Sequence, residues 1–146
     1  GLFAAVLAAG DRWLPELPSS GTAALPAAVR RALTGGFSYD DAIPAGTLAR
    51  WLVIAYLSVS AGFMEELAYR ALLFTACLRL PVAPLRLPLY VLGSAAAFAL
   101  VHFEQGLAAL VTVFALGVVA ALAYWQVRAV LPFMIAHALV DLVEFG

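Results

Sequence analysis

The 146-residue chain is poor in charge, because aspartate, glutamate, lysine and arginine together make up only 12% of it. Soluble domains carry about 25% charged residues, so a surface this apolar cannot be solvated by water on all sides. Lysine is absent and the net charge is -1, which leaves no basic footprint for a nucleic acid. With 65% hydrophobic residues and a mean hydropathy of +1.01, the sequence predicts an integral membrane protein.

Cysteine is almost absent, and two common hydrolase motifs are missing. Cys77 is the only cysteine, so no disulfide forms within the chain, and its apolar neighbours indicate a small buried or lipid-facing side chain. No serine lies in G-x-S-x-G, which disfavours a serine hydrolase. No H-E-x-x-H occurs either, which excludes the standard zincin site.

We expect a single membrane-embedded domain over residues 1–146, in three parts. Residues 1–10 are apolar but too short to span, and predict the tail of a transmembrane helix in a fragment of a larger membrane protein. Residues 11–47 predict a loop rich in proline and glycine. Within it, residues 26–34 predict a short helix, with proline in its first turn and Gly35 just past its end. Residues 48–146 predict the motif-bearing helical core.

The core predicts an all-α fold, a polytopic bundle of transmembrane helices. The expected helices are 48–80, 87–103, 107–127 and 131–145, with short links at 81–88 and 104–106. The first would be about 50 Å long, against an apolar layer of about 30 Å, so it must tilt, protrude or break. If the helix breaks, Gly62 is a candidate for the position of the break. Tyr124 and Trp125, at the end of the third helix, are expected to be interfacial anchors.

Ionisable side chains stand out inside these apolar helices, because a charge at bilayer depth costs about 2.5 kcal/mol or more. Three of the helices carry them: Glu65, Glu66 and Arg70 in the first, His102 in the second, and His137 and Asp141 in the fourth. Counted from the helix ends, Glu65, His102 and Asp141 each lie about 20 Å from the same side of the bundle. The sequence therefore predicts that these groups meet at one level as an intramembrane active site.

Local spacing predicts how the groups pair. Glu66 and Arg70 are four residues apart, so they face each other on one helix surface and can form an ion pair. Glu65 is turned by about 100° from Glu66 and is expected to face another helix. His137 and Asp141 share one edge of the last helix. Such a cluster suits activation of water: a carboxylate accepts the proton, and histidines bind a metal or stabilise the oxyanion.

Two other interpretations use the same groups. In a non-proteolytic membrane protein they would relay protons or bind an ion for transport, although the repeated halves and broken paired helices typical of transporters are not found in this sequence. In a catalytically silent binding or immunity factor they would only cross-link the helices by hydrogen bonds.

Three motifs in chain order resemble those of the CPBP intramembrane proteases, the family of type II CAAX prenyl endopeptidases and bacterial bacteriocin-processing or immunity (Abi) proteins. The motifs are Glu65-Glu66-x-x-x-Arg70, Phe98-x-x-x-His102 and His137-x-x-x-Asp141. Each motif alone is weak, whereas the three in order within an apolar bundle are fairly specific. The resemblance covers residues 48–145.

The resemblance implies peptide-bond hydrolysis by an intramembrane endopeptidase, commonly labelled a metalloprotease. It implies that Glu65 and His102 activate water and that Glu66 and Arg70 support them. His137 and Asp141 would stabilise the oxyanion or complete a metal site. The motifs leave open whether a divalent metal such as Zn²⁺ is bound; its ligands would be Glu65, His102, His137 and Asp141. The implied partners are a hydrophobic or prenylated peptide or protein and the lipid bilayer, in a bacterial cytoplasmic (inner) membrane.

The third motif departs from the family pattern. It often ends in asparagine, and this chain has Asp141. An ionised aspartate cannot donate a hydrogen bond to an oxyanion, whereas asparagine can. Asp141 is therefore protonated, orients His137, or ligates a metal. Tyr69 and Ala71 also replace the phenylalanine and glycine that often flank the arginine.

Overall fold

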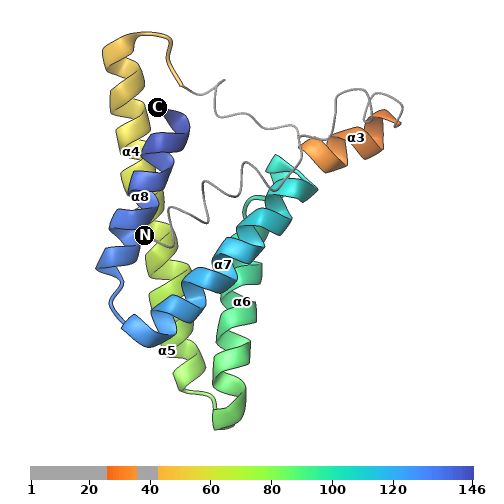
Figure 1. The fold of residues 1–146 in the computed structure, drawn as a ribbon, viewed down its shortest axis with the longest axis vertical. Coiled ribbons are helices and arrows are strands. Elements are labelled where there is room, and N and C mark those ends of the chain that lie inside the picture. Colours follow the sequence, from red (N-terminus) through yellow and green to blue (C-terminus); the bar gives the residue numbers. More distant parts are fainter. Residues whose placement is uncertain (1–25, 36–42) are drawn as a thin grey trace.

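The computed structural model describes residues 26–35 and 43–146, and every regular element within them is a helix (Figure 1). The α-helices are α3 (Ala27–Thr34), α4 (Thr47–Glu65), α5 (Leu73–Leu78), α6 (Arg86–Leu100), α7 (Leu107–Val127) and α8 (Leu131–Phe145). A π-helical segment, η2 (Glu66–Leu72), joins α4 to α5, and 3-10 turns η3 (Ala83–Leu85) and η4 (Phe103–Gln105) precede α6 and α7. The all-α prediction is confirmed. The spanning-helix tail expected at residues 1–10 and much of the loop expected at 11–47 fall outside the described residues.

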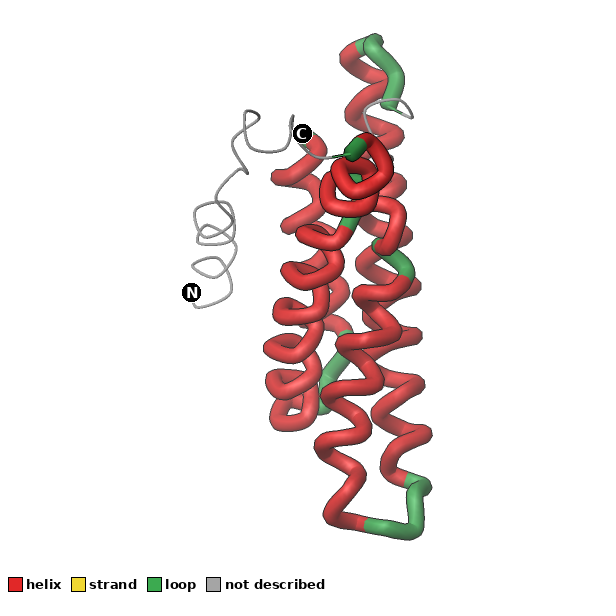
Figure 2. Tube along the Cα trace, turned by 90° about the vertical axis from the view of Figure 1, so that its right-hand side faces the viewer, coloured by secondary structure: helices red, strands yellow, loops and turns green. Residues whose placement is uncertain are grey.

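Two pairs of helices form the bundle: α4 packs along α8, and α6 packs along α7 (Figures 1 and 2). The segments α4, η2 and α5 follow one another as a single helical rod from Thr47 to Leu78, and α8 returns along the first part of it (Figure 1). η2 and α5 contact α6, and η2 also contacts α8. The π-helical segment is therefore the place where the two pairs meet.

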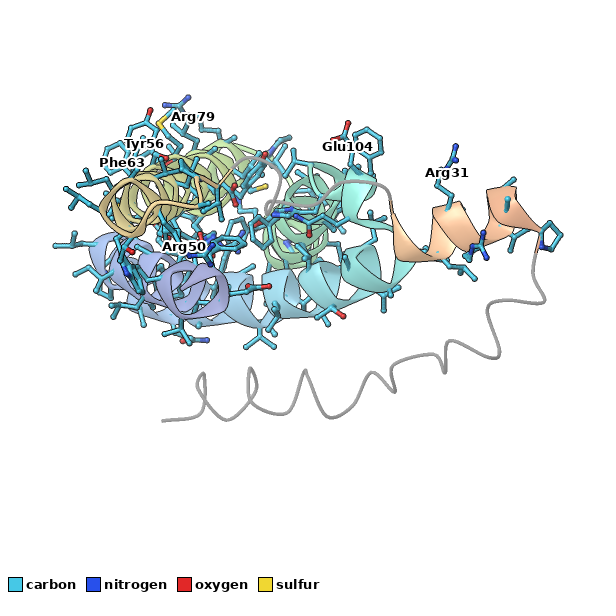
Figure 3. All side chains as sticks on the ribbon, turned by 90° about the horizontal axis from the view of Figure 1, so that it is seen from above. Arg31, Arg50, Tyr56, Phe63, Arg79 and Glu104 are labelled. Carbon is cyan, nitrogen blue, oxygen red and sulfur yellow. The ribbon has the colours of Figure 1, made fainter. Side chains whose placement is uncertain are left out.

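Three helical stretches are long and apolar enough to cross a membrane by length and composition: Thr47–Leu78, Ala83–Leu100 and Leu107–Val127. With 15 residues, α8 is about 22 Å long and shorter than these stretches. Large apolar side chains cover the outside of the bundle. Tyr56 and Phe63, for example, are 72% and 52% exposed and project outward from α4 (Figure 3). Such a surface fits contact with lipid rather than with water.

The helix ends follow local signals in the sequence. Pro26 precedes α3, and Gly35 ends it with a φ of 73°, in the region that glycine favours. The bounds of α7 and α8 are those predicted from the sequence. Arg128 ends α7 in the left-handed conformation, with a φ of 53°, and Pro132 lies in the first turn of α8.

Gly62 does not break the first helix, so that prediction is wrong. α4 runs through Gly62 without interruption, and the departure from α-helical geometry comes four residues later, in η2. The glycine instead lets α8 come close: a Cβ at Gly62 would lie 2.8 Å from the Met134 carbonyl oxygen and 3.0 Å from the Ala138 nitrogen. Small residues allow this kind of backbone approach between helices in membranes.

Tyr124 is buried, which corrects its predicted role as an interfacial anchor. Its ring packs edge-on against Phe74, with centroids 5.4 Å apart, and Tyr90 and Trp125 pack against the same phenylalanine at 5.4 and 5.3 Å. Edge-to-face pairs contribute about 0.5–1.5 kcal/mol each beyond the area that they bury. This aromatic cluster joins α5, α6 and α7 and positions the rod against the α6–α7 pair.

The α4–α8 pair is tied at its other end by Arg50. The guanidinium Nη2 donates a hydrogen bond to the Phe145 carbonyl oxygen at 3.0 Å, and Figure 3 shows Arg50 lying between the two helices. Carbonyls in the last turn of a helix lack intrahelical donors, so this bond satisfies one of them. Arg50 at one end and Gly62 in the middle thus fix how far α8 is displaced along α4.

The close approach at Gly62 predicts opposite effects for two glycine substitutions. Gly62→Ala is expected to lower the free energy of unfolding by about 1–3 kcal/mol, because its methyl group meets backbone atoms of α8. Gly93 in α6 is the matched control: a Cβ there meets nothing within 4 Å, so Gly93→Ala is expected to raise it by about 0.5–1 kcal/mol. Denaturant titration in detergent micelles measures both, and equal shifts would contradict the predicted helix contact.

Candidate active site

The two adjacent glutamates lie where α-helical geometry gives way to π-helical geometry. Glu65 is the last residue of α4 and Glu66 is the first of η2. At the far end of η2, the Leu73 amide bonds to the carbonyl of Ala68, five residues back, as in a π-helix. Single π-helical turns inside α-helices are frequent at functional sites. Here the wider turn carries Glu66 and Arg70, both of which are buried.

Glu66 is held by partners on two helices. Its Oε2 lies 3.2 Å from Arg70 Nε, so the predicted ion pair is present. Its Oε1 lies 2.9 Å from Nδ1 of His137 on α8. The first contact is an ion pair away from water, and the second is a hydrogen bond that becomes charge-assisted when the imidazole is protonated. Because both of its oxygens are engaged, Glu66 links η2 to α8.

Glu65 points toward the other side of the same imidazole. Its Oε2 lies 3.8 Å from His137 Nε2, and Asp141 Oδ1 lies 3.7 Å from that nitrogen. Both separations exceed a direct hydrogen bond and are short enough for one water molecule to contact both atoms. Glu65 Oε2 is buried and has no hydrogen-bond partner within the described part of the chain. Glu65 Oε2 therefore has only the more distant imidazole beside it, whereas Glu66 Oε2 forms a closer ion pair with Arg70 Nε at 3.2 Å.

His102 lies outside the helix predicted for it. α6 ends at Leu100, and His102 follows in the turn before η4, where its amide bonds to the Ala99 carbonyl in the tighter 3-10 pattern. The connection from α6 to α7 consists of Val101, His102, η4 and Gly106, which has a φ of 93°. His102 Nδ1 lies 2.8 Å from the Phe98 carbonyl oxygen. Since that oxygen can only accept, Nδ1 carries the proton, and in the neutral ring Nε2 keeps its lone pair.

Phe98 connects the two histidines. Its ring lies edge-on to His102 with centroids 5.1 Å apart, and edge-on to His137 at 5.9 Å. His102 also lies within electrostatic range of Asp141. Five of the predicted site residues therefore lie close together: Glu65, Glu66, Arg70, His137 and Asp141. His102 is linked to them through the Phe98 ring, which packs against both histidines.

Sequence reasoning missed the part that Ser94 plays in this site. No serine lies in a nucleophile motif, yet Ser94 is fully buried and bonds to Arg70 and to the Tyr69 carbonyl. The spacing along α6 could have indicated that Ser94 faces the site. Every fourth residue from Tyr90 to His102 faces the helical rod or the site. The series is Tyr90, Ser94, Phe98 and His102.

The expected metal ligands do not form a coordination shell in this arrangement. In the described ranges, 26–35 and 43–146, no group of three or more histidine, cysteine, aspartate or glutamate side chains is placed so that it could hold a metal ion. His137 Nδ1 is engaged with Glu66, and Nε2 is 3.7–3.8 Å from the nearest carboxylate oxygens. The described residues thus surround the His137 imidazole with carboxylates.

The fold and the site together define a class of protein. It is a helical membrane protein with a cluster of carboxylates and imidazoles inside its helix bundle. A model of the family described as type II CAAX prenyl endopeptidase Rce1-like matches residues 47–143, and the chain belongs to that family. This match supports the resemblance drawn from the three motifs, all of which lie within the matched residues. Comparisons with curated proteins and with solved structures found no match. The family and the apolar helices identify an integral membrane protein of a protease family.

The buried ion pair predicts a strong asymmetry between single and double substitutions. Arg70→Met leaves Glu66 buried without its main cationic partner, and is expected to lower the free energy of unfolding by about 3–5 kcal/mol. The double variant Glu66→Gln/Arg70→Met removes both charges and is expected to recover part of that loss. Denaturant titration in micelles measures both. The control is Arg79→Met, at an exposed arginine (Figure 3), with an expected change within about 0.5 kcal/mol.

Proposed function

We propose that the protein is an intramembrane endopeptidase in which Glu65 activates a water molecule for attack on a peptide bond. One observation carries the proposal: Glu65 Oε2 is buried, has no hydrogen-bond partner among the described residues, and lies 3.8 Å from His137 Nε2. A desolvated carboxylate oxygen beside an imidazole suits a general base. Membership of the CAAX prenyl endopeptidase family gives independent support for peptide-bond hydrolysis.

The proposed reaction uses these side chains in turn. Glu65 takes a proton from water as the water oxygen attacks the carbonyl carbon, giving a tetrahedral intermediate with an oxyanion. Glu65 then returns that proton to the amide nitrogen, the carbon–nitrogen bond breaks, and a carboxylic acid and an amine leave. His102, through the lone pair on Nε2, orients the attacking water. All atoms are thus accounted for, and no covalent bond forms between the enzyme and the substrate.

His137 is proposed to stabilise the oxyanion. As an imidazolium it donates from both nitrogens, from Nδ1 to Glu66 and from Nε2 toward the oxyanion. The surrounding carboxylates of Glu65, Glu66 and Asp141 compensate its positive charge. Asp141, at 3.7 Å from Nε2, orients the ring and does not need to donate a proton itself. Glu66 and Arg70 hold the ring from the other side.

The proposed substrate is a hydrophobic or prenylated peptide or protein that reaches the site from the bilayer. Two observations support this proposal: the family description names CAAX prenyl endopeptidases, and the described helices expose apolar side chains all along the rod. We further propose that the protein works in a bacterial cytoplasmic membrane, as the motif resemblance to the CPBP family implies.

Glu65→Gln is expected to reduce cleavage of a prenylated or hydrophobic peptide by about 10²–10⁴-fold, because glutamine cannot accept the water proton. His102→Ala is expected to give a loss of the same order. Reconstituted protein and a fluorogenic peptide measure both rates. Glu104→Gln, at an exposed glutamate in η4, is the matched control and should cleave at the wild-type rate.

Three outcomes separate the alternatives. Cleavage that survives Glu65→Gln in a folded protein overturns the role of Glu65. Wild-type protein that cleaves no peptide but carries protons or ions across vesicles, with the carriage lost in Glu65→Gln, favours an ion relay. Wild-type protein with neither activity favours a silent binding or immunity factor.

Asp141→Asn is expected to keep cleavage within about 10-fold of wild type, corresponding to about 1.4 kcal/mol in the barrier. The reason is that asparagine keeps an oxygen acceptor facing His137 Nε2, at a separation that one water molecule can bridge. The test pairs the cleavage rate with the metal content of both proteins, and with treatment of the wild type by a chelator followed by Zn²⁺. Complete loss of cleavage and of bound metal in Asp141→Asn would instead identify Asp141 as a ligand.

A further inference from the structure

Ser94 occupies the contact between α6 and the π-helical segment. Its side chain is fully buried, and its hydroxyl makes two hydrogen bonds to residues some 25 positions earlier in the chain. The hydroxyl donates to the Tyr69 carbonyl oxygen at 2.6 Å. It also accepts from Arg70 Nη1 at 3.3 Å. One small side chain therefore bonds both to the backbone of η2 and to its arginine.

The Tyr69 carbonyl requires a donor because of the π-helical turn. In an α-helix the Leu73 amide would bond to Tyr69, four residues back. Here that amide bonds to the carbonyls of Ala68 and Arg70 instead. A buried carbonyl that loses its donor costs about 1–3 kcal/mol. Ser94 supplies a donor from a neighbouring helix, so the wide turn and the serine stabilise each other.

The same serine helps to fix the Arg70 guanidinium. Arg70 Nε forms an ion pair with Glu66, and Nη1 donates a hydrogen bond to Ser94. The guanidinium carbon lies 4.6 Å from the centroid of the Phe98 ring. Ionic, hydrogen-bonding and cation–π contacts thus hold one planar group from three sides. The orientation of Arg70 in turn determines where Glu66 presents its second oxygen to His137.

We propose that Ser94 is a positioning residue: it holds η2 in its π-helical form and, through Arg70 and Glu66, sets the orientation of the His137 ring for hydrolysis. This inference rests on the proposed function. Ser94 is not the nucleophile, because its proton is donated to a carbonyl and a lone pair accepts from Arg70. The chain of contacts runs from α6 through η2 to α8.

The test compares Ser94→Ala with Ser60→Ala in the reconstituted full chain. Ser94→Ala is expected to reduce kcat by about 10–100-fold with KM unchanged, because it alters the alignment of the reacting groups and not a contact with substrate. Ser60 is the matched control: its hydroxyl bonds to the Leu57 carbonyl within its own helix, so Ser60→Ala should keep both constants. Ser94→Cys, of similar volume but with a weaker donor, should give an intermediate kcat.

Infrared spectra of protein labelled with ¹³C at the tyrosine carbonyls give a readout that does not need activity. The Tyr69 band is assigned by its absence in Tyr69→Phe, and it should move to higher frequency in Ser94→Ala as the hydrogen bond is lost. A kcat equal to that of Ser60→Ala, or an unmoved band, overturns the inference. If the wild type cleaves no peptide, the proposed function fails, and the band still decides whether Ser94 holds the π-helical segment.

Discussion

The rest of the structure depends on the carboxylate of Glu66, which connects two helical segments. It is almost fully buried, with one oxygen on Arg70 of its own helical segment and the other on His137 of α8. In a medium that excludes water, a carboxylate that loses a partner cannot find a replacement in solvent, so the contacts support one another. The helix pair α4–α8 is tied to α6 by the same route, because Arg70 also contacts Ser94 and Phe98.

The two adjacent glutamates differ in burial, and this difference gives them different roles. Both belong to the same turn, yet the side chain of Glu66 is 5% exposed while that of Glu65 is 25% exposed. The rotation of about 100° between neighbouring helical residues turns Glu66 into the helix contact and Glu65 toward the open side of His137. A structural carboxylate and a chemically available one can therefore be consecutive residues.

Features that depend on local chemistry were predictable from the sequence. The bounds of α7 and α8 follow from Gly106 and Pro132, and the Glu66–Arg70 pair follows from four-residue spacing. That spacing brings the two side chains together in η2 as it would in an α-helix. The alignment of the motif groups by depth likewise anticipated that Glu65, His137 and Asp141 would meet.

Features that depend on contacts between distant segments were not predictable. The π-helical turn involves a hydroxyl on another helix, which bonds to the Tyr69 carbonyl. A glycine in an apolar helix has the same local appearance whether it bends the helix or admits a neighbour, and only the backbone of α8 decides for Gly62. The environment of an aromatic residue at a helix end is similarly ambiguous in the sequence. Tyr124 packs against Phe74 rather than at a lipid headgroup.

The bond from Arg50 to the Phe145 carbonyl brings the first turn of α4 next to the last turn of α8. The path of the motif-bearing core therefore begins and finishes at the same end of the bundle. Segments whose ends are adjacent can be inserted into longer polypeptides, or cut and rejoined in a different order, with little disturbance of their interior. The polar centre thus lies in a unit whose first and last helical turns are held together by one hydrogen bond.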